Sequence, residues 1–145
     1  MLIWRKLKIT LEMIKFEHTV FALPFALIGA LLASGGLPAW WQLGWIVLAM
    51  VGARSAAMAF NRLADIHIDG LNPRTKQRPL VNGNLTVRFA VLFTFAMSGL
   101  FVFSAWRLNT LCFYLSFPTL CILFFYCYTK RFRSLSHLVL GFAIG

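Results

Sequence analysis

The stretch Asn61–Leu80, NRLADIHIDGLNPRTKQRPL, joins an acidic motif to a basic loop. Asp65 and Asp69 are two of only four acidic residues in a chain with a formal net charge of +10. The second half of the stretch carries three basic side chains, Arg74, Lys76 and Arg78. Such a concentration of opposite charges indicates a binding site for a charged ligand.

The composition around this stretch is typical of a membrane protein. Of 145 residues, 60% are hydrophobic and 12% are charged, whereas soluble domains average about 25% charged residues. Long uncharged runs follow His18, Arg88 and Arg107, and each can supply a helix of about 20 residues that crosses a bilayer. We therefore predict an all-α, polytopic transmembrane helix bundle of about four to five helices.

The apolar runs define the expected helices. We predict helices over about residues 19–33, from about 42 into the acidic motif, over about 89–106 and over about 108–128. The segments Ser34–Trp41 and Asn72–Gly83 contain the Pro and Gly residues of connecting loops. A fifth helix would begin near Leu135 without room to cross a bilayer, so we expect residues 1–145 to be the N-terminal part of one longer transmembrane domain.

Basic residues gather in alternate connections between the expected helices. They precede the first helix, fill the loop after the second and follow the fourth, whereas only Arg107 lies on the opposite side. Cytoplasmic loops carry this excess, so we expect the acidic motif to be cytoplasmic, and the net charge then requires no nucleic acid. A signal peptide that ends near Leu31–Gly36 is an alternative for the first run. The further spans that follow argue against it.

The acidic motif has the spacing of a metal-binding helix face. Asn61, Asp65 and Asp69 are four residues apart and project from one side of a helix. Neighbouring carboxylates repel each other unless a cation lies between them, and Mg²⁺ is usually bound by one or two carboxylates together with water and phosphate oxygens. These three residues are therefore candidate Mg²⁺ ligands. The alternative is that both aspartates form ion pairs with Arg62 and Arg74 at a solvated helix end.

The basic loop suits a phosphate ligand. Arginine binds phosphate oxygens in a bidentate manner, and lysine supplies a point charge. Arg74, Lys76 and Arg78 are therefore candidates to neutralise a diphosphate that a metal bridges to the acidic motif. The alternative is that they reflect only the bias of cytoplasmic loops toward positive charge.

Two further positions are candidate ligand contacts. Arg54 lies seven residues before Asn61, on the same helix face but deeper in the membrane, where an ionisable residue is costly and faces a protein interior or a cavity. It can bind the carboxylate of a small acidic substrate or form an ion pair within the bundle. Tyr126 and Lys130 share a face at the end of the fourth helix. They can contact the same anion or act as interfacial anchors.

These residues together resemble the UbiA superfamily of intramembrane aromatic prenyltransferases. NRLADIHID is similar to the family's NxxxDxxxD motif, RTKQRPLVNG to the basic loop that follows it, and Tyr126 with Lys130 to its YxxxK motif. Arg54 matches an arginine that many members carry seven residues before the motif asparagine. The resemblance covers nearly the whole chain.

The resemblance implies a bundle of about nine helices, of which this chain would form about half, in a bacterial inner membrane. It implies that Asn61, Asp65 and Asp69 hold Mg²⁺ and the diphosphate of a polyprenyl donor, and that Asp65 and Asp69 are catalytic. Arg74, Lys76, Arg78, Tyr126 and Lys130 would contact the donor, and Arg54 the aromatic acid. Membrane lipid would surround the bundle.

Two departures from the family pattern bear on the chemistry. Arg62 follows the motif asparagine where many members have aspartate, which leaves open how many metal ions the motif binds. No acidic residue follows Asp69, so the family's second aspartate-rich motif is absent, and the chain alone is expected to be inactive. The segment Ile14–Ala33 resembles a branch whose acceptors are 4-hydroxybenzoate, for ubiquinone, or a dihydroxynaphthoate, for menaquinone.

Two other classes of protein place aspartates in membrane helices. CDP-alcohol phosphatidyltransferases share the four-residue spacing, but the residues after Asp69-Gly70 do not continue their pattern. A transporter or channel could use Asp65 and Asp69 as ion ligands. Against it, the aspartates lie at the end of a helix beside a basic loop and not at the middle of the membrane.

Overall fold

The computed structural model describes residues 2–129, which fold into helices and connecting turns without a strand. The helices are α1 (Leu2–Ile14), α2 (Phe16–Ser34), α3 (Trp40–Ala64), α4 (Ile66–Leu71), α5 (Val87–Leu108) and α6 (Thr110–Thr129). The predicted all-α class is confirmed. The expected helix near Leu135 and the candidate residue Lys130 lie outside the described residues.

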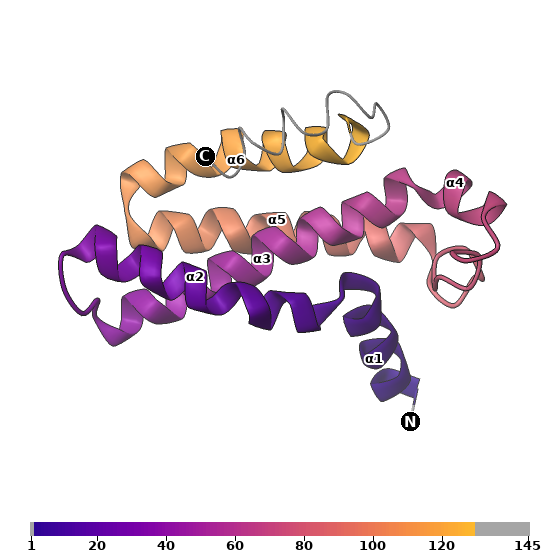
Figure 1. The fold of residues 1–145 in the computed structure, drawn as a ribbon, viewed down its shortest axis with the longest axis horizontal. Coiled ribbons are helices and arrows are strands. Elements are labelled where there is room, and N and C mark those ends of the chain that lie inside the picture. Colours follow the sequence, from indigo (N-terminus) through magenta and orange to yellow (C-terminus); the bar gives the residue numbers. More distant parts are fainter. Residues whose placement is uncertain (1, 130–145) are drawn as a thin grey trace.

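Helix α3 is the central element of the bundle. It packs most extensively against α5 and also contacts α1, α2 and α6. Helices α2, α3, α5 and α6 run along the length of the molecule, while α1 turns away from α2 at one end (Figure 1). Helix α4 and the loop of residues 72–86, which we call the basic loop, lie at this same end (Figure 1).

Three of the described helices, α3, α5 and α6, are long and apolar enough to cross a membrane. A fourth span results if the bent pair of α1 and α2 is counted as one. Large apolar side chains remain on the outside of these helices, among them Phe21, Phe25, Leu92 and Phe95. Exposed apolar surface of this extent fits contact with lipid, so the fold is that of an integral membrane protein.

Helices α3 and α5 approach each other closely at Gly52. A Cβ atom built on Gly52 would lie 3.0 Å from both the carbonyl oxygen of Met97 and the amide nitrogen of Phe101. Both are backbone atoms, which cannot move aside as a side chain can. Glycine therefore allows the two helices to approach each other here, as small residues do in membrane helix pairs.

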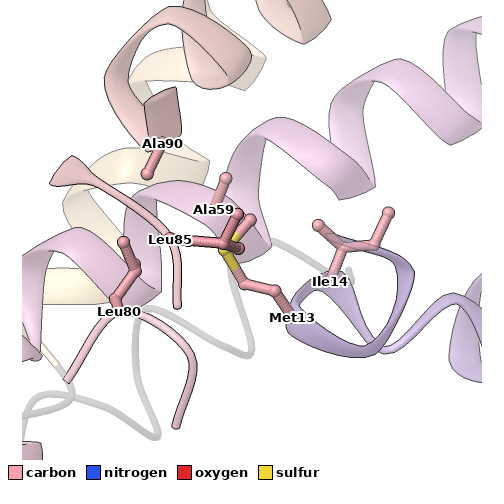
Figure 2. Close-up of a cluster of buried hydrophobic side chains, with 6 residues drawn as sticks. All are labelled: Met13, Ile14, Ala59, Leu80, Leu85 and Ala90. Carbon is pink, nitrogen blue, oxygen red and sulfur yellow. The ribbon is translucent and has the colours of Figure 1, made fainter. Parts of the chain in front are cut away.

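A small apolar core fastens α1 and the basic loop to the bundle. Met13 and Ile14 of α1, Ala59 of α3, Ala90 of α5 and two leucines of the loop form one buried cluster. Figure 2 shows Leu85 beside Ala59 of α3, with Met13 approaching from one side and Leu80 and Ala90 lying on the other. The charged end of the molecule is thus held by apolar contacts.

The structure differs from the sequence-based expectation in two elements. Residues 2–14, which we expected only as a basic segment before the first helix, form α1. The second predicted helix does not continue unbroken through the acidic motif, because α3 ends at Ala64 and α4 begins at Ile66. Asp65 occupies the junction with φ −90° and ψ 1°, outside helical geometry.

Candidate functional site

The acidic motif lies at the junction between α3 and α4. Asp65 N–H donates to the carbonyl of Asn61 at 3.1 Å, and Asp69 N–H donates to the carbonyl of Asp65 at 2.8 Å. The four-residue hydrogen-bond pattern of a helix therefore passes through the junction although the backbone bends there. Asp65 and Asp69 are each only 6% exposed. The structure thus keeps the predicted spacing but buries both carboxylates.

Asp69 binds the basic loop directly. Its Oδ2 accepts a hydrogen bond and forms an ion pair with Nη1 of Arg78. The hydroxyl of Thr75 donates to the backbone carbonyl of Asp69 at 3.0 Å, which anchors the middle of the same loop. An ion pair of Asp69 was one of the predicted alternatives, but the partner is Arg78 and not the expected Arg62 or Arg74.

Arg54, Asn61 and Tyr126 line one cavity of about 540 Å³, which we call the Arg54 cavity. Arg54 and Asn61 come from α3, and Tyr126 reaches it from α6. The rest of the wall is apolar or small, formed by Ala22, Met50, Ala53, Ala57, Met58, Leu123 and Cys127. The predicted shared face of Arg54 and Asn61 is therefore confirmed, and Tyr126 faces it from across the bundle.

Arg54 has spare hydrogen-bonding capacity inside this cavity. Its Nε atom is buried and has no hydrogen-bond partner among the residues that the structure describes. A buried donor without a partner costs about 1–3 kcal/mol or more for a charged group. A carboxylate bound in the cavity would satisfy this donor.

Two of the three predicted loop cations line a different cavity, of about 760 Å³, which we call the basic cavity. Arg74 and Arg78 form part of its wall together with residues of α1 and the end of α3. Lys76 is exposed and lines neither of these two cavities. The linings of the two cavities share no residue, so the structure separates most of the loop cations from Arg54.

Sequence reasoning missed three charged residues of the basic cavity, Glu12, Lys15 and Arg62. Glu12 and Lys15 were overlooked because residues 2–14 were not expected to be helical. A sequence signal for this helix was present, since Ile9 and Met13 are four residues apart and both face the core. Arg62 was considered only as a departure from a motif and as an ion-pair partner of the aspartates. It is 8% exposed, and its Nε donates to the carbonyl of Met13 at 3.4 Å.

The donors of the acidic motif fit part of a magnesium site. Two buried carboxylates and the amide of Asn61 are oxygen ligands of the kind that Mg²⁺ prefers, and Mg²⁺ commonly retains water and substrate phosphate as further ligands. Within residues 2–129 no three His, Cys, Asp or Glu side chains come together as a metal site by themselves. Water and a bound diphosphate would supply the further oxygen ligands of a metal at this motif.

Comparison with known proteins identifies the class. The chain matches the UbiA prenyltransferase family over residues 22–145, and it therefore belongs to that family. A solved structure described as the apo structure of a UbiA homolog from Aeropyrum pernix has the same fold, with a TM-score of 0.80 and 44% identity. This likeness covers 88% of the present chain and 46% of that one.

Individual relatives carry a more specific name. The chain is 42% identical over 117 residues to the 4-hydroxybenzoate octaprenyltransferase of Methylobacillus flagellatus, which covers 81% of this chain and 40% of the relative. It is 40% identical over 114 residues to the protein of that name in Saccharophagus degradans. This match covers 79% of the present chain and 38% of that relative. The chain thus spans about two fifths of the length of these curated relatives. Members of the family generally bind diphosphate through a divalent metal.

Proposed function

We propose that the protein, when complete, transfers a polyprenyl group from a polyprenyl diphosphate to 4-hydroxybenzoate in ubiquinone-type quinone biosynthesis. The observation that carries this proposal is the Arg54 cavity, in which an arginine with a buried Nε atom lies among apolar residues on the same helix as Asn61 of the acidic motif. The names of the relatives support the same reaction class.

The donor diphosphate would bind at the junction of α3 and α4. Asp65, Asp69 and Asn61 would hold Mg²⁺, which supplies positive charge to the leaving diphosphate. Breaking the allylic C–O bond moves an electron pair onto the diphosphate, so cations already in place stabilise the transition state. Arg78, held against Asp69, and Arg74 and Lys76 on the same loop are the proposed protein cations. Lys130 is proposed for the same role from the sequence motif.

The Arg54 cavity would hold the reacting groups away from water. Its alanine and leucine side chains carry no nucleophile that could attack an allylic cation, and the apolar wall would exclude the water that quenches such a cation. Arg54 would bind the acceptor's carboxylate and so orient the ring. The electron-rich ring carbon then attacks the prenyl cation, forms the C–C bond and loses its ring proton. Tyr126 and Asn61 would position the two substrates.

A dihydroxynaphthoate acceptor, used for menaquinone, is the second candidate. It is also an acidic hydroxyarene, and the carboxylate-binding role of Arg54 serves both acceptors equally. Offering both acids to the complete protein with a polyprenyl diphosphate and Mg²⁺ distinguishes the two. Transfer to 4-hydroxybenzoate with a higher kcat/KM supports the proposal, and a clear preference for the naphthoate would replace it.

The role of Arg54 has its own test. Replacing a charged hydrogen bond to a carboxylate costs about 1.5–3 kcal/mol, so Arg54→Gln should raise the KM for the aromatic acid about 10- to 100-fold. The KM for the polyprenyl diphosphate should change little. The control is Arg107→Gln, because Arg107 lies in the last turn of α5, outside the cavity.

A neutral acceptor separates binding from folding. The parent enzyme should prefer 4-hydroxybenzoate strongly over its uncharged amide, and Arg54→Gln should lose most of that preference. Unchanged discrimination between acid and amide would show that Arg54 does not bind the carboxylate.

A further inference from the structure

The basic cavity shares Arg74 and Arg78 with the cations proposed for the donor diphosphate, but its other lining residues have no role in the proposed transfer reaction. It lies between α1, the basic loop and the end of α3. Four cationic side chains line it against the single acid Glu12, namely Lys15, Arg62, Arg74 and Arg78. Asp69 neutralises Arg78 through their ion pair, but the remaining positive side chains still outnumber the acidic ones. A cavity of this charge is suited to an anion.

Arg62 gives this cavity a buried cation. It is 8% exposed, and the described hydrogen bond of its Nε goes to a neutral carbonyl, that of Met13. A guanidinium carries five N–H donors in a fixed fork that suits phosphate oxygens. A buried charge is costly without an opposite charge nearby, and an anion in the cavity would add to the attraction that Asp65 and Asp69 exert on Arg62.

Helix α1 indicates where this cavity lies relative to a membrane. One side of α1 packs on the core through Ile9, Met13 and Ile14. Another side leaves Trp4, Leu7 and Leu11 exposed, at helical positions i, i+3 and i+7. Exposed lysines, Lys6, Lys8 and Lys15, accompany these apolar residues. A helix with exposed tryptophan and leucine beside lysines is typical of the interface between lipid headgroups and acyl chains.

We propose that the basic cavity binds the phosphate of an anionic phospholipid headgroup. The apolar residues of α1 contact the acyl chains, and the cations of the cavity bind the phosphate at headgroup depth. The volume of about 760 Å³ accommodates a glycerophosphate and is far larger than a free phosphate needs. The side chains of Thr75, Gln77 and Asn84 line the same cavity and can bond headgroup hydroxyls.

The test compares two lysines at the same end of the molecule. Lys15 lines the cavity, whereas Lys8 is an exposed lysine of α1 that does not. The purified complete protein in an uncharged detergent is titrated calorimetrically with short-chain phosphatidylglycerol and with phosphatidylcholine of the same chain length. We expect tighter binding of phosphatidylglycerol, about fivefold weaker binding for Lys15→Gln, and no change for Lys8→Gln.

An equal loss of phosphatidylglycerol affinity in Lys15→Gln and Lys8→Gln would overturn the proposal. It would show that the overall positive charge of this end of the molecule attracts the lipid, and not the cavity. Equal binding of the two lipids, or no binding of either, would also overturn it. Inorganic phosphate or diphosphate that displaces the lipid at equal concentration would assign the cavity to a soluble anion instead. Arg62→Gln, provided that it keeps the parent unfolding temperature, should weaken the binding of phosphatidylglycerol at least as much as Lys15→Gln does.

Discussion

At the scale of single residues, Asp69 connects the acidic motif to the basic loop. Its carboxylate pairs with Arg78 and its carbonyl accepts from Thr75, so one residue fixes two points of the loop. Exposed ion pairs contribute little, but the side chain of Asp69 is 9% exposed and that of Arg78 is 32% exposed. The pair is therefore shielded enough from water to help position the loop.

The coupling between these two residues is measurable. Asp69→Asn and Arg78→Gln should each make the basic loop more susceptible to limited proteolysis. The loop of the double variant should be cleaved little faster than the loop of either single variant. Contacting charged residues show coupling energies of roughly 0.5–3 kcal/mol. Asp69→Asn combined with Arg74→Gln is the matched control, because no ion pair joins Asp69 to Arg74 within the described residues. Additive effects of Asp69 and Arg78 would contradict the pairing.

Some residue positions could be predicted and others could not. Arg54 and Asn61 reach one cavity as expected, because both belong to one regular helix and helical spacing fixes their direction. The partner of Asp69 was not predictable, because the path of an irregular loop has no period from which to infer contacts. The functional roles of all the candidate site residues stay predictions that await substitution, namely Arg54, Asn61, Asp65, Asp69, Arg74, Lys76, Arg78, Tyr126 and Lys130.

At the scale of elements, the α3–α5 contact depends on Gly52. Gly52→Ala would place a methyl group 3.0 Å from two backbone atoms of α5, so the helices would have to separate. Overpacking of this kind costs about 1–3 kcal/mol. The variant should unfold at a temperature several degrees lower than the parent in detergent.

Gly44 provides the matched control within the same helix. A Cβ built on Gly44 meets nothing within 4 Å. Gly44→Ala should therefore leave the unfolding temperature unchanged or raise it, since alanine favours the helix by about 1 kcal/mol. Equal effects of the two substitutions would show that the close approach at Gly52 does not limit packing.

The membrane helices were the most predictable elements. Apolar runs between charged residues gave α3, α5 and α6 to within a few residues, because a bilayer demands a long uncharged segment. Helix α1 was not expected, because its charges interrupt every apolar run and its core-facing residues are few. The bend at Asp65 has no signal in the sequence, since aspartate is compatible with both a helix end and a helix interior.

At the scale of the whole molecule, the charged segments share one end of the bundle. Helix α1, helix α4 and the basic loop lie together there, and the turn between α5 and α6 lies at the other end (Figure 1). Arg107 is near that second turn, where it lies 5.5 Å from the centre of the Trp45 ring. This separation agrees with the charge pattern, which predicts that the end with the acidic motif is cytoplasmic.

Reporter fusions test this orientation in cells. Alkaline phosphatase, which is active only outside the cytoplasm, should be inactive when fused after Gly83 and active when fused after Asn109. Green fluorescent protein, which is fluorescent in the cytoplasm, should give the opposite pattern at both positions. High phosphatase activity after Gly83 would show that the acidic motif faces away from the cytoplasm.

We propose that the acidic motif drives metal-dependent prenyl transfer by the complete protein. The most direct measurement is Mg²⁺-dependent transfer from a polyprenyl diphosphate to 4-hydroxybenzoate by the complete protein with and without Asp65→Asn. Asparagine keeps the shape of the side chain but removes the charge, so kcat/KM should fall at least 100-fold, about 2.7 kcal/mol of transition-state stabilisation. The unfolding temperature should be nearly unchanged. Undiminished transfer by Asp65→Asn would contradict the account.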